Sequence, residues 1–547
     1  MSYVHTKVKG WLVATVLAAM VAPVYAQQPK DGDGVGDEQV VVTKAYEINI
    51  QDAQKQNIQP NVPEIEEKPK VLNYSVPTKD IKDFTFEPNP LKPIALGAEK
   101  LEKYNSSYIK VGFGSQIMPI AQLAYNDNKT KNLKFGIHYN HLSAMDYKIK
   151  PKRFSDDQAG LYVRYYPKKF EIGMAFNFQN LRTHFFGTDS TEKNKDIRQV
   201  YRNYEGTVYF GNGQKNKADI DYKQSVTFNY MTEKFGKANE WYIAGNTDFR
   251  KGIKKQHAAL ANIQFDVSRL TRDTSKLNRT IITIAGGYAF NNDDWRAHGI
   301  FGLTMFGQKP FLYTDLHVEK RLYEHSIIAY IDYTHKLRKN SLNSYAHVNN
   351  WVENSLDVRN SLVGDLGIGF KGTLQNFSYN VAFHFNHIKQ NPFFVNDTMD
   401  MKRFLVVYDS NTLVYNAHFE AGYNVKEWLR FTLVGDYNHY QLKNQARAWS
   451  EPAFRTTFRA NYIWKKKISV YLDLYGVTST YAPLAVVDGS EVKLKGTADI
   501  NVGIEYFFNK HVSFWGMINN IANQNYGRFY KYTSYGINGA IGAKFAF

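Results

Sequence analysis

The chain closes with the stretch YGINGAIGAKFAF, from Tyr535 to Phe547, and this stretch decides the fold class. Every second position counted back from its last residue is apolar, aromatic or glycine: Phe547, Phe545, Ala543, Ile541, Gly539, Ile537 and Tyr535. The positions between them are small or polar, so the pattern has the period of two that predicts a β-strand with two different faces. The predicted strand is about twice as long as an ordinary globular strand. Because an unpaired edge strand invites aggregation, it is expected to pair with another strand and close a sheet.

The other end of the chain has the features of a secretory signal peptide. Lys7 and Lys9 precede an apolar run over Gly10–Val24, and the residues that follow suit cleavage before Gln27. These features predict a cleaved signal over residues 1–26. The alternative is a short membrane anchor, but the apolar run is too short to span a bilayer comfortably. The chain contains no cysteine, which excludes disulfides and thiol catalysis.

The composition favours a transmembrane β-barrel. Mean hydropathy is −0.47, as in many soluble proteins, yet aromatic residues make up 15% of the chain, with 39 Tyr and 36 Phe. In a barrel only every second residue meets lipid, so the mean hydropathy stays low. The net charge of +17 would also suit nucleic-acid binding. No nucleic-acid recognition module is present and export argues against that partner, so a basic lumen or basic rim is the preferred explanation.

Alternating strands continue through residues 105–547. Clear examples lie at residues 133–140, 454–464, 468–474 and 498–506. One face of each is apolar and the other carries polar or charged residues, so the second face cannot form a dry core. A barrel with an apolar outside and a wet inside satisfies both faces. A large soluble sandwich or propeller would show the same period and remains the alternative.

Four charged side chains on the polar faces are predicted to point into the lumen: Arg455, Arg459, Asp499 and Glu505. They are expected either to pair across strands as struts or to line a selective channel. Struts are the preferred interpretation, because buried charges are usually paired.

Short and long connections alternate along the chain. Short basic turns occur in YPKKFEIG, KRLYEHSII, YNVKEWLRF, YIWKKKISV and FFNKHVSF, and long polar stretches lie between them. This alternation predicts about 22 strands in an all-β, antiparallel, up-and-down transmembrane barrel, with 16 to 20 strands as the alternative. The strands are least regular between residues 203 and 256. The short turns and the chain end are expected on the periplasmic side.

Residues 27–104 differ from the rest. They hold eight of the chain's 16 prolines and lack a core pattern. We expect an extended, largely disordered periplasmic segment.

The last fifty residues resemble the C-terminal end of TonB-dependent receptors, in which an NN or NL segment follows a strand and a Tyr-rich loop precedes a final strand ending in Phe. The stretches YNSSYIKVGFGSQIMPIAQLAYND, FFVNDTMDMKRFLVVYDS, ARAWSEPAFRTTFRANY and LKGTADINVGIEYFF resemble Bacteroidetes outer-membrane barrels of the TonB-dependent-receptor-like type. The resemblance implies an integral outer-membrane barrel in contact with lipid, and a role in transport, but no substrate. It also implies that Phe545 and Phe547 form a signal for the barrel-assembly machinery.

The stretch DEQVVVTKAYE, over residues 37–47, resembles the Ton box of these receptors. The resemblance implies that Glu38, Val40, Val41, Val42 and Thr43 contact the TonB energy-coupling protein. Its β-branched residues suit strand addition to a partner's edge. A chance match is the alternative, because short motifs often match unrelated sequences.

The chain departs from the receptor pattern in one respect. Only sixty residues, 45–104, separate Lys44 in the Ton-box-like stretch from Asn105 at the start of the barrel, so no recognisable plug domain is present. Gated import by plug movement is therefore in doubt. A separate plug or lid protein, or loops and lumen side chains, can fill the pore instead. We predict that residues 71–104 enter the lumen or rim, while residues 27–70 stay in the periplasm.

The sequence predicts neither an enzyme nor a cofactor or metal site. It contains no P-loop, zinc motif or nucleophile elbow. His138 and His141 fall on opposite faces of one strand, which is poor geometry for a metal. A structural or assembly component of an outer-membrane complex is the alternative to a transporter. A barrel enzyme with Ser and His at its rim is a weaker one.

Overall fold

The computed structural model describes residues 107–547, apart from 128–129, 150, 168–169, 188–196, 213–216, 324–325, 354–356 and 484–489. The chain divides into two units, Met1–Gly97 and Ala98–Phe547, and the described residues all belong to the second. The predicted signal peptide, the segment 27–104 and the Ton-box-like stretch lie outside the described residues.

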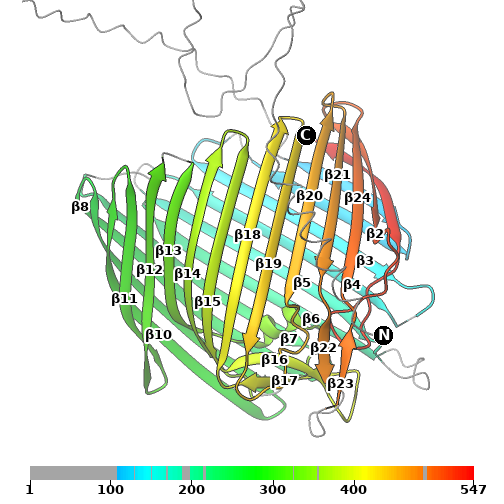
Figure 1. The fold of residues 1–547 in the computed structure, drawn as a ribbon, viewed down its shortest axis with the longest axis horizontal. Coiled ribbons are helices and arrows are strands. Elements are labelled where there is room, and N and C mark those ends of the chain that lie inside the picture. Colours follow the sequence, from blue (N-terminus) through cyan, green and yellow to red (C-terminus); the bar gives the residue numbers. More distant parts are fainter. Residues whose placement is uncertain are drawn as a thin grey trace, which may run out of the picture. The chain divides into compact units, whose positions relative to one another are not determined.

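The described residues form a closed antiparallel barrel of 22 strands (Figure 1). In chain order its strands are β1 (Tyr108–Gly114), β2 (Met118–Asn126), β3 (Leu133–Met145), β4 (Arg153–Tyr165), β5 (Glu171–Phe185), β6 (Ile197–Gly211), β7 (Ile220–Glu233), β8 (Ala238–Lys254), β9 (His257–Arg272), β10 (Ser275–Asn291), β11 (Trp295–Phe306), β12 (Lys309–Tyr323), β13 (Ile327–Arg338), β14 (Ser361–Leu374), β15 (Phe377–Lys389), β18 (Thr412–Lys426), β19 (Leu429–Gln441), β20 (Phe454–Trp464), β21 (Ile468–Val477), β24 (Thr497–Phe507), β25 (Val512–Asn519) and β26 (Asn538–Ala546). Each strand pairs with the next one in this order. The predicted fold class and the count of 22 are confirmed, and the alternative of 16 to 20 strands is wrong.

The terminal strand closes the barrel, as its pattern predicts. β26 pairs with β1, from Tyr108 opposite Ala546 to Gly114 opposite Ala540. The strand is nine residues long, however, and begins at Asn538 rather than at Tyr535. Tyr535 leaves the outward register because its hydroxyl donates hydrogen bonds at 3.0 and 3.3 Å to backbone carbonyls of the β3–β4 connection and β3. The prediction of a strand over the whole stretch is wrong for its first three residues and for Phe547.

Glycines on both strands of this seam, one of them in the quoted stretch, allow it to close. Gly542 lies opposite Gly112 of β1, and the indole of Trp515 packs against both. A Cβ atom added at Gly112 would lie 2.3 Å from that ring, and one added at Gly542 would lie 2.6 Å from it. The spaced glycines therefore make room for a large side chain on the inner face of the seam.

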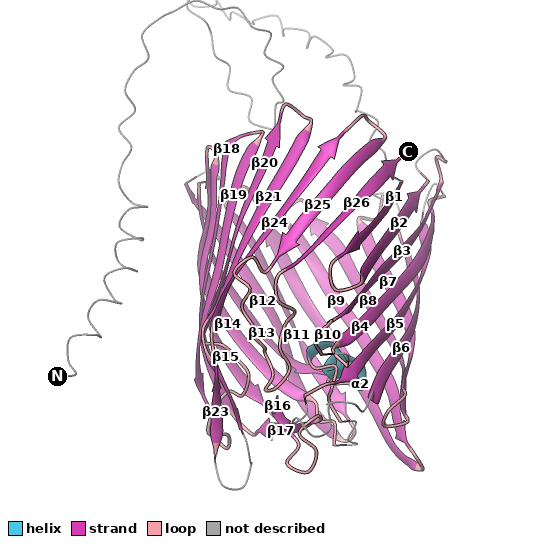
Figure 2. Ribbon diagram, turned by 90° about the vertical axis from the view of Figure 1, so that its right-hand side faces the viewer, coloured by secondary structure: helices cyan, strands magenta, loops and turns pink. Residues whose placement is uncertain are grey.

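The two ends of the barrel differ, and Figure 2 shows both. We call them the short-turn end, where β1 begins and β26 ends, and the long-loop end. All five predicted short turns lie at the first. The long-loop end carries additional structure, namely the helix α2 (Leu342–Val348) and the hairpins β16 (Asn391–Asn396) with β17 (Phe404–Asp409) and β22 (Thr480–Pro483) with β23 (Glu491–Leu494). In the described ranges, no helix is long and apolar enough to cross a membrane.

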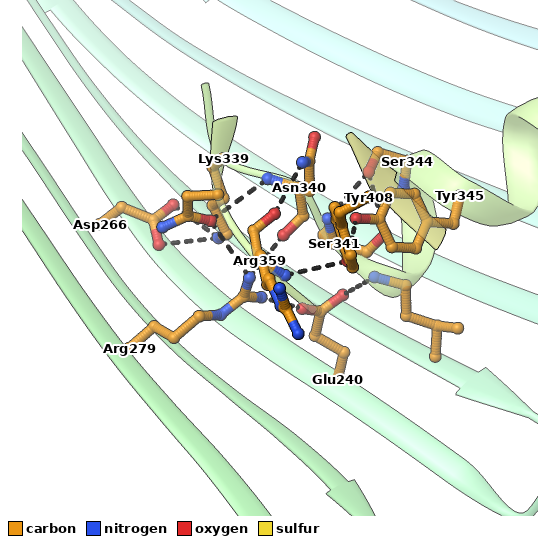
Figure 3. Close-up of polar contacts among 12 residues, drawn as sticks. Glu240, Asp266, Arg279, Lys339, Asn340, Ser341, Ser344, Tyr345, Arg359 and Tyr408 are labelled. Atoms are coloured by element: carbon orange, nitrogen blue, oxygen red, sulfur yellow. Dashed lines mark hydrogen bonds and ion pairs between the residues drawn. The ribbon is translucent and has the colours of Figure 1, made fainter. Parts of the chain in front are cut away.

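The two faces of the wall are distinct. Glu240, Asp266 and Arg279 point toward the residues around α2 (Figure 3), which Figure 2 shows inside the long-loop end. Their face is therefore the inner one, and alternation places Ile284 and Phe301 on the outer face, where their exposed fractions are 62% and 54%. The apolar face is thus the outside of the barrel. A soluble sandwich would bury that face, so that alternative is wrong.

Candidate functional site

Aromatic side chains from separate connections meet inside the long-loop end. We call this group the mouth cluster; it consists of Phe186, Tyr345, Trp351, Phe394, Phe404, Phe529 and Tyr532. Trp351 and Tyr532 have ring centroids 3.9 Å apart, and Phe404 lies 5.2 Å from Phe529. Phe404 is 1% exposed. Burial of several aromatic side chains gives these connections a hydrophobic core of their own.

Backbone hydrogen bonds join the connections that carry the cluster. The segment between β13 and β14, residues 339–360, holds α2 and is called the α2 segment below. Val352 forms a parallel bridge with Phe404 of β17. The backbone N–H of Glu353 donates to the carbonyl of Phe404 at 2.7 Å. The α2 segment and the β16–β17 hairpin therefore form one folded body.

The barrel wall holds the α2 segment through buried charges (Figure 3). Glu240 of β8 and Arg279 of β10 form an ion pair at 2.6 Å, and their side chains are 1% and 2% exposed. The second oxygen of Glu240 accepts the backbone N–H of Leu342 at 2.9 Å. Arg279 donates to the backbone carbonyl of Asn340. One wall ion pair thus binds the start of the helix from two sides.

A second ion pair lies beside the first. The Nζ of Lys339 lies 2.7 Å from both carboxylate oxygens of Asp266 on β9. Ser341 and Ser344 form a capping box at the start of α2. Three consecutive strands, β8, β9 and β10, therefore hold the α2 segment. We call the four charged residues that make these contacts the α2 anchor: Glu240, Asp266, Arg279 and Lys339.

A buried carboxylate fastens the neighbouring loop. Asp409, at the end of β17, is fully buried. It accepts hydrogen bonds of 2.6 to 3.1 Å from backbone N–H groups of the loop after β19 and the hydroxyl that follows β17: Lys443, Asn444, Gln445 and Thr412. Burial alone raises the pKa of the Asp409 carboxyl, but these hydrogen bonds, led by that of Asn444, outweigh it and hold the pKa below its usual value.

We expect Asp409→Asn to loosen the loop over residues 442–453, because an amide nitrogen replaces an acceptor among several donors. The cost should be about 1 to 3 kcal/mol of local stability. Since the folded pKa of Asp409 is depressed, its contribution is present above the unfolded pKa and is lost as the pH falls through the folded one. Hydrogen exchange of the 443–445 amides at neutral and acidic pH checks this. Equal protection in both proteins at neutral pH would contradict it.

The inner wall behind the mouth is polar and hollowed. A cavity of about 530 Å³ lies beside the α2 anchor and is lined by polar and charged side chains, including Asn262, Gln264, Asp266, Thr283 and Lys339, together with apolar ones such as Ile281 and Leu337. A smaller cavity of about 160 Å³ is lined by Arg455, Lys495 and Arg528, with Tyr475 and Tyr526. The first suits a neutral polar solute or a cation, and the second suits an anion.

The strand register places the four predicted lumen charges on the inner face. Arg459 pairs with Asp473 of the next strand at 2.6 Å. Arg455 lies 3.7 Å from Glu451. The pairings join each residue to a partner outside the predicted set of four.

The two carboxylates also have partners of their own. The hydroxyl of Tyr526 donates to Asp499 at 2.8 Å. Glu505 accepts from Ser513 at 2.5 Å and lies 3.5 Å from Lys544. The four charges do not meet in one site, so they are better placed to brace the wall than to act together on a ligand.

The terminal aromatic residues lie at the short-turn end. Phe545 and Phe547 have ring centroids 5.7 Å apart and are 48% and 47% exposed. The backbone N–H of Phe547 donates to the carbonyl of Ser107 at 2.9 Å. The predicted contact residues Glu38, Val40, Val41, Val42 and Thr43 lie outside the described residues.

The described part of the chain contains no group of three or more His, Asp or Glu residues that could hold a metal ion. His138 and His141 lie on opposite faces of β3, and His141 contacts Asp157 at 2.6 Å.

No family model matches the sequence, and no curated protein matches it. Solved structures do match the fold. The FrpB iron transporter from Neisseria meningitidis aligns with a TM-score of 0.65 at 12% identity, over 82% of each chain. The siderophore receptor PirA from Acinetobacter baumannii aligns with a TM-score of 0.63 at 8% identity, over 82% of this chain and 81% of that one. The ferric-catecholate import receptor Fiu from E. coli gives 0.61 at 10% identity, over 81% and 82%. The barrel matches those of TonB-dependent receptors. At these identities the likeness shows the fold alone.

The mouth cluster and the α2 anchor are not part of the sequence predictions. Two of the stretches that contribute to them, residues 338–361 and 389–400, are predicted from the sequence to be long polar loops. Tyr345, Trp351 and the pair Phe393–Phe394 are the signal that these loops have a core, because aromatic residues are otherwise uncommon in solvated loops.

Proposed function

We propose that this protein is an integral outer-membrane barrel that takes up a solute through its long-loop end, past the α2 segment. The observation that carries this proposal is the combination of a closed barrel with a polar, hollowed inner wall and a mouth occupied by a folded segment. That segment is fastened to the wall largely by side-chain contacts, which can separate without unfolding a strand. The names of the structural neighbours, an iron transporter and siderophore receptors, support a transport role.

The cargo that we infer is negatively charged. Arg455, Lys495 and Arg528 line the 160 Å³ cavity, and Glu451 is the carboxylate that approaches both arginines. A cavity with more cations than anions favours an anionic solute. Tyr475 adds a hydroxyl group to the same cavity, and the rings of Tyr475 and Tyr526 add flat apolar surfaces.

Energy for uptake is proposed to come from the TonB protein, which would bind the extended stretch Val40–Thr43 as an added strand. Phe545 and Phe547 are proposed to present the last strand to the barrel-assembly machinery. A separate plug or lid protein, or residues 71–104, is proposed to complete the closure of the lumen.

The test of coupling is Val41→Pro, because proline removes a backbone donor and fixes φ. We expect the variant to lose cross-linking between a photoreactive residue at position 40 and TonB, and to lose growth on the nutrient that the protein imports. Gln54→Pro, outside the stretch, is the matched control and should keep both. Cross-linking that survives Val41→Pro would contradict a Ton box.

A structural or assembly role is the second candidate. The inward ion pairs, such as Arg459 with Asp473, are what a braced wall needs. Normal growth of a deletion strain on every nutrient tried, together with co-purification of other outer-membrane proteins, would favour that role.

A further inference from the structure

The larger of the two wall cavities shares part of its lining with the α2 anchor. Lys339 and Asp266, which form one of the anchor's ion pairs (Figure 3), both line this cavity of about 530 Å³. Each of the two side chains is 18% exposed. The volume falls in the range of small-molecule binding sites. A solute in the cavity therefore contacts residues that hold the α2 segment against the wall.

The same ion pair shows how this part of the wall binds an ammonium group. The Nζ of Lys339 lies 2.7 Å from both carboxylate oxygens of Asp266 and 4.1 Å from the centroid of the Tyr242 ring. A carboxylate attracts an ammonium group by its charge, and an aromatic face attracts it by its quadrupole. A lysine of the chain itself thus occupies one ammonium site in the lining of the cavity.

Two further carboxylates in this lining have no lysine or arginine partner. Asp248 makes no ion pair with the residues that the structure describes, and it accepts hydrogen bonds from the neutral amides of Asn246 and Asn262, both at 2.7 Å. Asp315 lies 3.6 Å from His298, which is charged only when protonated. Because the lysine of the lining is already paired, the cavity has a negative balance. Its sign is opposite to that of the 160 Å³ cavity.

The strand register separates these two carboxylates. A row of residues that lie opposite one another crosses the inner wall from β8 to β12: Asp248, Asn262, Ala285, Gly302 and Tyr313. Asp315 is the next inward position after Tyr313 on β12. Adjacent strands are about 4.8 Å apart, so the backbones of β8 and β12 are separated by up to about 19 Å. This separation is too large for one metal ion, but an extended solute with several cationic groups can contact both carboxylates.

We propose that this cavity binds a linear polyamine, and that the bound polyamine loosens the α2 segment. Two ammonium groups pair with Asp248 and Asp315, and Tyr313 supplies an aromatic surface beside them. A further ammonium group competes with Lys339 for Asp266, because it has the same charge and the same hydrogen-bond donors.

This inference goes beyond the proposed function, in which the cargo is an anion in the smaller cavity. The binding step stands without that function. Only the consequence for uptake, an easier opening of the long-loop end, rests on it.

The test of the site titrates spermidine into the full-length protein purified in detergent and measures the heat of binding. Butane-1,4-diol and magnesium chloride are the comparison solutes. We expect saturable binding of spermidine that weakens as the salt concentration rises, no binding of the diol, and weaker binding of magnesium. Asp248→Asn and Asp315→Asn should each weaken spermidine binding by about tenfold, because each removes one charge partner.

Asp473→Asn is the matched control, because Asp473 is an inner-wall carboxylate that pairs with Arg459 and lies outside this lining. It should leave spermidine binding unchanged. The shift in gel migration on heating verifies that each variant forms the barrel. Absence of saturable binding, equal binding of the diol or of magnesium, or unaltered affinity in both aspartate variants would overturn the polyamine site.

Hydrogen exchange of amides 340–352 tests the effect on the α2 segment. Saturating spermidine should lower the protection of these amides in the wild type. Lys339→Gln should show lower protection without spermidine and no further decrease when spermidine is added. Binding without a change in protection would overturn the competition with Lys339. Outer-membrane fractionation and the Val41→Pro experiment test the proposed function separately, because neither depends on spermidine.

Discussion

Replacing Glu240 with alanine is expected to release the α2 segment and open the long-loop end. The change leaves Arg279 buried without its carboxylate and removes the acceptor for the backbone N–H of Leu342. Removing one partner of a buried ion pair costs about 3 to 5 kcal/mol. Because the pair holds the α2 segment against the wall, the loss of stability should appear as local opening of that segment and not as separation of barrel strands.

Hydrogen exchange of amides 340–352 and conductance in a planar bilayer measure that opening. Protection of these amides should fall by at least about a hundredfold, since each 1.4 kcal/mol is a factor of ten. Asp473→Asn is the control, because its partner Arg459 is 54% exposed and exposed pairs contribute about 1 kcal/mol or less. Unchanged protection in Glu240→Ala would contradict the anchor.

Combining Glu240→Ala with deletion of residues 71–104 shows whether the α2 segment is the main barrier. A rise in conductance with Glu240→Ala alone identifies the segment as that barrier. A rise in the combined variant only would assign a share of the closure to residues 71–104.

Phe404→Ala is expected to disrupt the packing of the mouth cluster. Phe404 is 1% exposed and contacts the rings of both Phe529 and Tyr532. A buried Phe→Ala change costs about 3 to 5 kcal/mol. Limited proteolysis should then cut within residues 339–360 and 391–409, while the shift in gel migration on heating, which reports the intact barrel, stays unchanged.

Phe301→Ala provides the comparison, because Phe301 is a large aromatic on the outer face with 54% exposure. It should leave the protease pattern unaltered. Equal proteolysis of Phe404→Ala and wild type would show that the wall contacts alone hold the mouth segments.

The barrel could be predicted from the sequence, because the residue patterns that specify its strands and turns are local. The alternation in residues 498–506 and the turn in FFNKHVSF each depend on a few neighbouring residues, and together they give strand, face and turn. The same reasoning places Arg459 on the inner face. It does not give the partner of Arg459, because Asp473 is brought opposite only by the register of β20 with β21.

The α2 anchor could not be predicted from the sequence, because its contacts join residues that are far apart along the chain. Glu240, Asp266 and Arg279 come from three strands, and Lys339 comes from a connection far along the chain. Each taken alone is an ordinary polar residue of an amphipathic strand. Only the closed barrel brings them to one place, so their chemistry depends on register and curvature rather than on spacing.

The pairing of β26 with β1 has a consequence for biogenesis. β26, which is synthesised after all the other strands of the wall, is the partner of the first strand, so this joint forms only after the whole wall has been synthesised. Contacts between such distant positions form slowly, because the chain loses the entropy of loop closure before the contacts contribute any stability. A prematurely terminated chain would therefore yield no smaller pore. It would be an open sheet with two unpaired edge strands, which the cell must degrade before it aggregates.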